Sequence, residues 1–123
     1  MLKADVFCAQ CASRNVIELL AEKWSLLIIH SLSQSPKRTG ELRRHVGGIS
    51  EKMLIQTLRG LERHGFVSRH AFPEVPPRVE YVLTPLGDRL SALVKALDGW
   101  VEENCAEILA AQRAFDAQKD VPA

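Results

Sequence analysis

The spacing of apolar residues along the first half of the chain predicts four consecutive helices. They span residues 11–20, 24–32, 39–46 and 50–64. We expect Ser13 or Asn15 to cap the first helix, Thr39 the third and Ser50 the fourth, because a side-chain oxygen at that position accepts a hydrogen bond from the first turn. The second helix is apolar on nearly all sides, which places it at the centre of a small core.

Alternation of apolar and polar residues then predicts two strands, over residues 66–72 and 79–83. One face of the second strand carries the apolar residues Val79, Tyr81 and Leu83. Residues 73–78 between the strands include three prolines, which cannot continue a ladder of backbone hydrogen bonds. The pattern therefore indicates a hairpin closed by a stiff loop. The predicted fold is mainly α with this small β-hairpin.

A last helix is predicted over residues 85–110, with Thr84 as its cap and Pro85 at its first position. It is longer than one four-helix core can cover, so part of its apolar stripe would stay exposed in a monomer. A second copy related by a two-fold axis would bury that stripe, whereas the alternative is that the helix folds back on its own domain. The stripe consists of Leu97, Trp100, Val101, Ile108 and Leu109.

Composition narrows the class of protein. A chain of 123 residues with 46% hydrophobic and 25% charged residues is typical of one folded domain and not of a disordered chain. The longest apolar run, residues 24–29, is too short to span a membrane, and no secretory signal opens the chain. Three cysteines without such a signal predict a reducing, cytoplasmic location and no disulfide framework.

The formal net charge of +1 hides an asymmetry along the chain. Residues 36–78 hold nine Lys or Arg and four Glu, a local charge of +5, and the remainder is −4. This basic segment coincides with the third and fourth helices and the hairpin. Clustered basic charge of this kind is typical of a surface that meets nucleic acid.

The third and fourth helices, joined by Gly47-Gly48, have helix-turn-helix proportions, and the hairpin after them completes a winged helix. On the fourth helix the polar residues lie opposite Leu54, at about 100° per residue. Arg and Lys can donate to guanine or phosphate, and Gln can pair with adenine. The alternative is an ordinary solvated basic face. The predicted DNA-binding residues are Ser50, Lys52, Met53, Gln56 and Thr57 near the bases, and Arg59, Arg63, Arg69 and Arg78 near phosphates.

Several motifs resemble the HxlR-type branch of the MarR-like winged-helix regulators. They are Cys11, Glu22-Lys23-Trp24, residues 40–43, residues 49–54, and above all residues 73–81 with Leu83-Thr84 and Gly87 after them. The resemblance implies an N-terminal arm over residues 1–10, a winged helix-turn-helix domain over residues 11–112 and a C-terminal tail over residues 113–123. It also implies a homodimer formed by the helices at the two termini.

The resemblance further implies that Cys11 senses oxidants or electrophiles, although the family usually has a proline where Ala12 stands. A cysteine near a helix N-terminus, with Arg14 close by, favours the reactive thiolate. The alternative is a small buried hydrophobe. Cys8, or Cys105 of a second subunit, is the candidate partner of Cys11.

The C-x-x-C spacing of Cys8 and Cys11 has two other readings. Zinc would need a second pair of ligands, and a thioredoxin-like enzyme would need a strand before the motif; neither is visible. The sequence therefore predicts a cytoplasmic, dimeric regulator that binds a pseudo-palindromic DNA operator, without catalytic residues, cofactor, metal or membrane partner. A small electrophile or oxidant is the candidate effector. The main alternative is a winged helix that serves only as a protein-interaction module.

Overall fold

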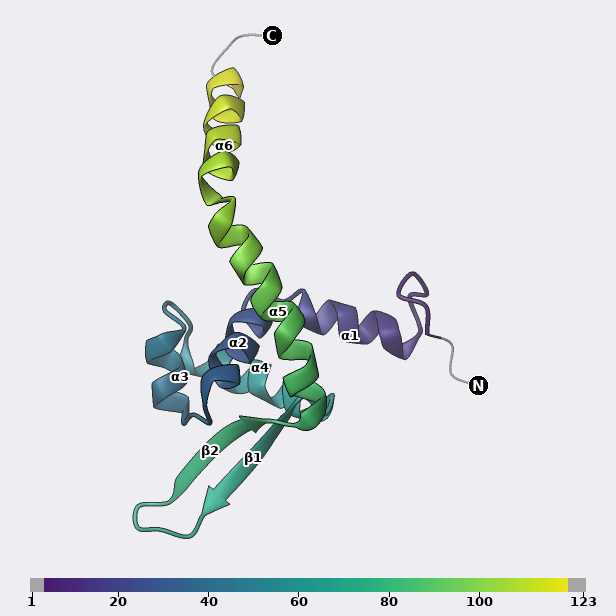
Figure 1. The fold of residues 1–123 in the computed structure, drawn as a ribbon. Helices are drawn as coiled ribbons and strands as arrows, with labels where there is room; N and C mark the ends of the chain where they lie inside the picture. Colours follow the sequence, from purple (N-terminus) through teal and green to yellow (C-terminus); the bar gives the residue numbers. More distant parts are fainter. Residues whose placement is uncertain (1–3, 120–123) are drawn as a thin grey trace.

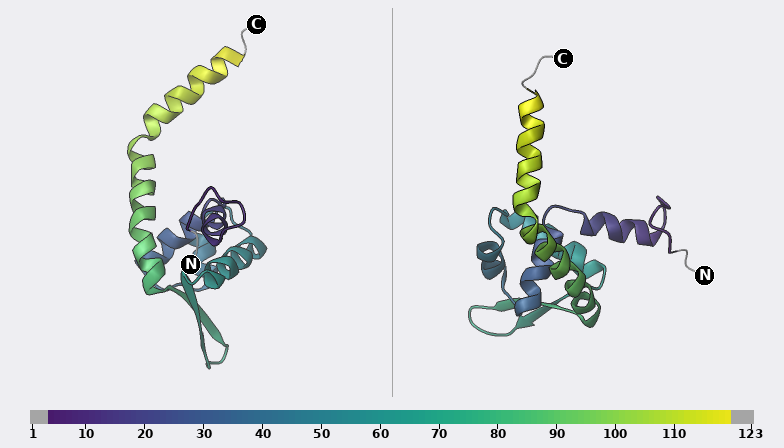
Figure 2. Two further views of the ribbon diagram at one scale, coloured as in Figure 1. Left: turned by 90° about the vertical axis from the view of Figure 1, so that its right-hand side faces the viewer. Right: turned by 45° about the horizontal axis from the view of Figure 1, so that its top comes forward.

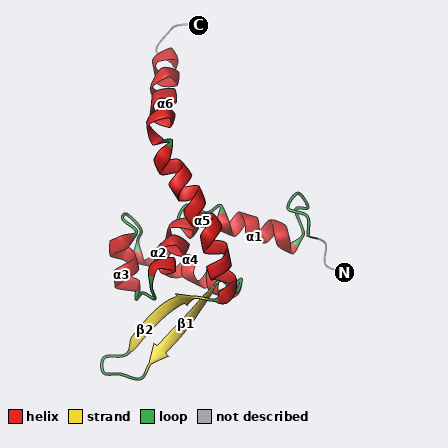
Figure 3. Ribbon diagram, viewed as in Figure 1, coloured by secondary structure: helices red, strands yellow, loops and turns green. Residues whose placement is uncertain are grey.

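The protein, described as a computed structural model over residues 4–119, is built mainly from helices. Figure 3 shows the helices in red and a single antiparallel hairpin in yellow. The predicted class, mainly α with a small β-hairpin, is confirmed. In chain order the elements are α1 (Ala12–Leu20), α2 (Ser25–Gln34), α3 (Thr39–His45), α4 (Glu51–Arg63), β1 (Val67–Phe72), β2 (Arg78–Leu83), α5 (Pro85–Glu103) and α6 (Cys105–Lys119) (Figure 1).

Helix α2 lies at the centre of the core, as its apolar character predicted. Ile28 and Ile29 are fully buried, and α2 is in contact with α1, α3, α5 and β2. Helix α4 contributes its predicted stripe of leucines, which are also fully buried. The core is completed by Leu32, Leu42, Val46, Ile49, Leu54, Leu58, Leu61, Phe66, Val67, Tyr81 and Val94.

The hairpin pairs β1 with β2 in antiparallel register, from Val67 opposite Leu83 to Phe72 opposite Arg78. Its base is tied to the segment between α2 and α3. Lys37 N–H donates to the carbonyl of Tyr81 (3.0 Å), and Tyr81 N–H donates to the carbonyl of Lys37 (2.8 Å). This bridge, together with the burial of the Tyr81 side chain, holds the hairpin against the helices.

Two of the predicted caps are confirmed and two are not. The Ser50 hydroxyl accepts from Met53 N–H, and the Thr84 hydroxyl accepts from Gly87 N–H, both at 3.1 Å. Helix α3 instead begins after Arg38, whose N–H donates to the Glu41 carboxylate (3.0 Å). That carboxylate satisfies the free donor, and the N-cap therefore lies one residue before the predicted Thr39. Helix α1 begins after Cys11, which occupies the N-cap position in place of Ser13 or Asn15 but makes no side-chain capping hydrogen bond.

The predicted single helix over residues 85–110 is two helices in the structure. Helix α5 ends at Glu103, and α6 leaves at an angle that the left view of Figure 2 shows clearly. Both the N–H and the side-chain amide of Asn104 donate to the Trp100 carbonyl, at 3.0 and 2.8 Å. An asparagine side chain that competes for a backbone carbonyl in this way ends a helix locally.

Helix α6 also extends to Lys119, so most of the tail predicted from residue 113 is helical. Its alanines, glutamines and arginine are strong helix formers, which explains the extension. Residues 1–3 of the predicted arm and 120–123 of the predicted tail lie outside the described residues. Figure 1 shows α1 and α6 projecting from the body in different directions. Within residues 4–119, no helix has the length and apolar character needed to cross a membrane.

Candidate nucleic-acid interface

The turn that leads into α4 depends on glycine. Gly48 has a φ of 90°, a left-handed conformation that costs a residue with a side chain more than it costs glycine. A Cβ at this position would also lie 3.7 Å from the Trp24 ring. The turn therefore reverses the chain tightly between α3 and α4, as the predicted helix-turn-helix requires.

Helix α4 has one fully buried side and one polar exposed side. Leu54, Leu58 and Leu61 are fully buried against the core. The exposed side carries the predicted polar residues together with two acidic neighbours that the prediction left out. These exposed residues are Glu51, Lys52, Gln56, Arg59, Glu62 and Arg63. The placement of the predicted cations and Gln56 opposite the leucines is thus confirmed.

Thr57 does not belong to this exposed side. It retains only 1% of its accessible surface, and its hydroxyl donates to the Met53 carbonyl (2.8 Å). The reason is angular, because Thr57 lies only about 60° around the helix from Leu54. We therefore remove Thr57 from the residues expected near DNA bases. Met53 and Ser50 remain exposed at the beginning of the helix.

A groove between α4 and β1 brings together two predicted cations from different elements. Arg59 of α4 and Arg69 of β1 both line it, with Glu62 beside them and Ile55 and Tyr81 completing the wall. Arg69 lies opposite Tyr81 in the hairpin register. The structure thus places two guanidinium groups and one carboxylate along a single groove next to the exposed side of α4.

Arg78 has a different environment from the other predicted cations. Its guanidinium lies 3.3 Å from the Glu74 carboxylate and 3.9 Å from that of Glu80. It also lies over the Phe72 ring, 4.2 Å from the ring centroid. These contacts join the two strands at the end of the hairpin and neutralise the charge of Arg78. The loop tip beyond them exposes Val75 completely.

Three further arginines of the basic segment were not among the predicted DNA-binding residues: Arg38, Arg43 and Arg44. All three are exposed on or beside α3. Arg38 and Arg44 line a second groove that also includes Glu80 of β2. The local charge of residues 36–78 was the signal that could have added these three arginines to the predicted site, because it includes the cations of α3 as well as those of α4.

The structure pairs two of the three cysteines, whereas the sequence predicted no disulfide framework. Cys8 and Cys11 form a disulfide, and Cys105 is free and exposed. Of the two candidate partners of Cys11, the structure therefore pairs it with Cys8. Among residues 4–119, no three His, Cys, Asp or Glu side chains are grouped so that they could hold a metal ion.

The family is established by comparison with known proteins. A model of HxlR-like helix-turn-helix proteins matches residues 19–109, from the end of α1 into α6. The chain belongs to this family. The relatives that match this chain are described as transcriptional regulators, and this chain is accordingly a transcriptional regulator with a winged helix-turn-helix.

Two similar proteins and one more distant one place the chain within the HxlR-like family. The HTH-type transcriptional regulator YtfH of Escherichia coli (strain K12) is 47% identical over 108 residues, covering 88% of this chain and 86% of that protein. The solved structure of ytfH from Salmonella typhimurium is 44% identical with a TM-score of 0.84, covering 90% of this chain and 99% of that one. The redox regulator HypR in its reduced form is 32% identical with a TM-score of 0.73, over 79% and 96% of the two chains.

Proposed function

We propose that this HxlR-like protein binds a specific DNA operator through α4 and regulates transcription in the cytoplasm. The proposal rests on the side chains that the exposed side of α4 presents. Lys52, Gln56, Arg59 and Arg63 face outward on a helix whose opposite side is fully buried, so the helix is held rigidly while these side chains are available to a major groove.

Within this arrangement we assign base contacts to Lys52 and Gln56, with Ser50 and Met53 at the edge. Phosphate contacts are assigned to Arg59, Arg63 and Arg69, and to Arg43 and Arg44 on α3, because the first helix of such a motif crosses the DNA backbone. Arg78 organises the hairpin through its two carboxylate neighbours and the Phe72 ring.

Selection of bound duplexes from a random DNA pool tests this proposal directly. The expected result is one enriched sequence with two related half-sites. The affinity for that duplex and for a scrambled duplex of the same length is then compared at one salt concentration. Equal affinities would contradict sequence-specific binding and favour the alternative, a winged helix that serves as a protein-interaction module.

The active unit we propose is a homodimer. Leu97, Trp100 and Val101 on α5 and Leu109 on α6 are large apolar residues that remain exposed in the single chain. Several large exposed apolar residues along two successive helices are typical of an interface. A two-fold partner would set two recognition helices about 34–36 Å apart, one turn of DNA. Sedimentation of the full chain measures this state.

We further propose that the protein responds to oxidants through Cys11. The relative HypR is described as a redox regulator, and Cys11 occurs here in a disulfide at the beginning of α1. Treatment with diamide is expected to change operator affinity in the wild type. A Cys11→Ser variant that responds like the wild type would exclude Cys11 as the sensor.

A further inference from the structure

We infer that Cys8 and Cys11 form a dithiol–disulfide switch within one subunit, and that α1 transmits its state to the recognition helix α4. This inference rests on the proposed redox function and specifies its chemistry and its route. Three features of the molecule support it: the turn that holds the two cysteines, the contacts that fasten this turn to α1, and the contact of α1 with α4.

The turn brings the two cysteines together by its own backbone hydrogen bonds. Cys11 N–H donates to the Cys8 carbonyl, and Cys8 N–H donates to the Asp5 carbonyl, both at 3.1 Å. The two Cα atoms are 5.4 Å apart, within the range that a disulfide requires. Formation of this bond therefore needs nothing from a second subunit.

Cys105 is a poor competitor for the same partner. It begins α6, while the two other cysteines lie before α1, and Figure 1 shows these two parts of the chain on different sides of the body. A bond from Cys11 to Cys105 would have to join two chains or close a long loop. Closing the short loop between Cys8 and Cys11 costs less conformational entropy than closing the long loop to Cys105 of the same chain.

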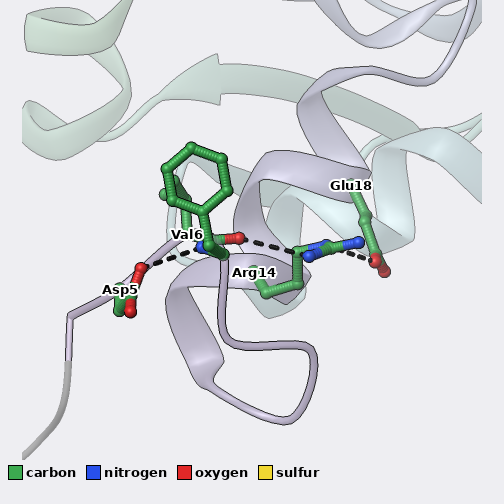
Figure 4. A network of polar contacts seen from close by, with 5 residues as sticks. Asp5, Val6, Arg14 and Glu18 are labelled. Carbon is green, nitrogen blue, oxygen red and sulfur yellow. Dashed lines mark hydrogen bonds and ion pairs between the residues drawn. The ribbon is translucent and has the colours of Figure 1, made fainter.

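Arg14 provides a second connection between this turn and α1 (Figure 4). Its guanidinium donates to the Glu18 carboxylate (3.1 Å) and to the Val6 carbonyl (3.5 Å). With the disulfide in place, the turn is fastened to α1 at both Val6 and Cys11. Phe7 is held outward between these two points with 87% of its surface exposed.

Reduction changes both the constraint and the charge at the beginning of α1. Cys11 is the N-cap residue of that helix, and its sulfur makes no capping hydrogen bond while it is in the disulfide. Breaking the bond leaves only non-covalent attachments, which are the Arg14 contact with the Val6 carbonyl and the hydrogen bond from Cys11 N–H to the Cys8 carbonyl. It also frees a thiolate at a helix N-terminus beside Arg14, where negative charge is favoured.

Helix α1 is positioned to transmit such a change because it is lightly held and touches α4. It contains no buried residue, and only Val16, Leu19 and Leu20 pack against the edge of the core. The Leu19 side chain lies against Gly60 of α4, where an added Cβ would be 2.9 Å from the Leu19 Cδ1 atom. Gly60 directly follows Arg59, so a shift of α1 reaches the part of α4 that carries the proposed phosphate contact.

The reaction needs an oxidant, and a small disulfide is the class that balances it. The Cys11 thiolate attacks one sulfur of the small disulfide, forming a mixed disulfide and releasing one thiolate. The Cys8 thiolate then attacks the Cys11 sulfur, forming the Cys8–Cys11 bond and releasing the second thiolate. Two electrons pass to the small disulfide, and the two released thiolates take up the two protons from the cysteines and become thiols.

The location of the bond is tested with the full chain oxidised by glutathione disulfide. Intact mass and peptide mapping under non-reducing conditions are expected to show Cys8 joined to Cys11 inside one subunit, in the wild type and equally in Cys105→Ser. A covalent dimer that disappears in Cys105→Ser would overturn the inference. Mapping does not depend on DNA, so this result stands apart from any failure of operator binding.

The transmission is tested with the duplex selected for the proposed function. Its affinity for the reduced and oxidised wild type is expected to differ by about tenfold or more, and the same difference is expected for Cys105→Ser but not for Cys8→Ser. Equal affinities of the two wild-type forms would overturn the switch while leaving operator binding intact.

The Leu19→Ala variant tests the route through α1. It is expected to form the same disulfide, with an affinity difference between its two forms well below that of the wild type. A difference equal to that of the wild type would overturn this route. Thermal unfolding confirms that the variant is folded, and Gly60→Ala, which alters the same contact from the α4 side, is measured in the same way.

Discussion

Lys52 is the residue on α4 whose substitution should most directly reduce the preference for the selected duplex. It is exposed near the beginning of the helix, opposite the buried leucines. Lys52→Ala is expected to weaken binding of the selected duplex by about 1–3 kcal/mol. Binding of a scrambled duplex should change much less, and fluorescence titration of both duplexes at one salt concentration measures the difference. Equal losses on both duplexes would assign Lys52 to phosphate contact.

Thr57 lies on the same helix but is buried, so its substitution is expected to change stability and not DNA preference. Thr57→Val keeps the shape of the side chain and removes the hydroxyl that donates to Met53. The free energy of unfolding is expected to fall by about 0.5–1.5 kcal/mol, the usual worth of one hydrogen bond. Denaturant unfolding measures this change, and the preference for the selected duplex should be unchanged. A loss of preference would return Thr57 to the base contacts.

At the scale of elements, the junction between β1 and α5 is packed so closely that only glycine fits. A Cβ at Gly87 would collide with the Phe66 carbonyl oxygen and lie 2.9 Å from its carbonyl carbon. Both partners are backbone atoms, which cannot move aside. Gly87→Ala is therefore expected to lower the free energy of unfolding by about 1–3 kcal/mol or more, as overpacking does, and this loss is measured as a lower midpoint of thermal unfolding.

Gly99 is the matched control because it lies in the same helix with open space around it. A Cβ there would have no atom within 4 Å. Gly99→Ala is expected to raise stability by up to about 1 kcal/mol, since alanine is the better helix former. Similar thermal midpoints for the two variants would show that the contact with Phe66 is relieved by a shift of α5.

The elements themselves were largely predictable from the sequence, and the exceptions share a cause. The leucine stripe of α4, the caps Ser50 and Thr84 and the proline-rich loop depend on local chemistry, which a sequence displays directly. The break at Asn104 was not predicted because the apolar periodicity continues through it. One side chain that donates to the Trp100 carbonyl decides the outcome there.

The same distinction applies to the site. The exposed cations of α4 follow from helical angles, and the sequence predicted them. The neutralisation of Arg78 by Glu74 and Glu80 depends on how the hairpin closes, which periodicity does not specify. The Cys8–Cys11 pairing depends on a turn that carries no apolar pattern, so both possible partners of Cys11 remained open.

At the scale of the whole molecule, the exposed apolar face of α5 and α6 predicts a stable dimer. Trp100, with 56% of its surface exposed, lies within this face. Trp100→Glu is expected to convert the dimer to a monomer and to weaken operator binding by removing the second half of the site. Sedimentation velocity measures the first effect. The control is Lys95→Glu, which should remain dimeric. Lys95 is exposed and lies about 140° around α5 from Trp100.

A dimer with basic residues on α3, α4 and β1 should also bind DNA with a strong dependence on salt. With about 6–10 phosphates neutralised, affinity for the selected duplex is expected to fall by about 10³ to 10⁵ between roughly 50 and 200 mM salt. A titration series across this range measures the slope. A slope near zero would favour the protein-interaction module over a DNA-binding regulator.

The bridge between Lys37 and Tyr81 has a consequence for the length of the DNA half-site that the proposed function requires. Because paired backbone hydrogen bonds join the base of the hairpin to the chain that enters α3, the hairpin and the recognition helix keep one spacing. If the protein binds DNA as proposed, each subunit would therefore accept a half-site of one length only. An extra base pair inside a half-site would move the DNA groups that the recognition helix and the hairpin contact further apart. Binding of such a duplex is expected to weaken, because the helix and the hairpin could not both keep their contacts.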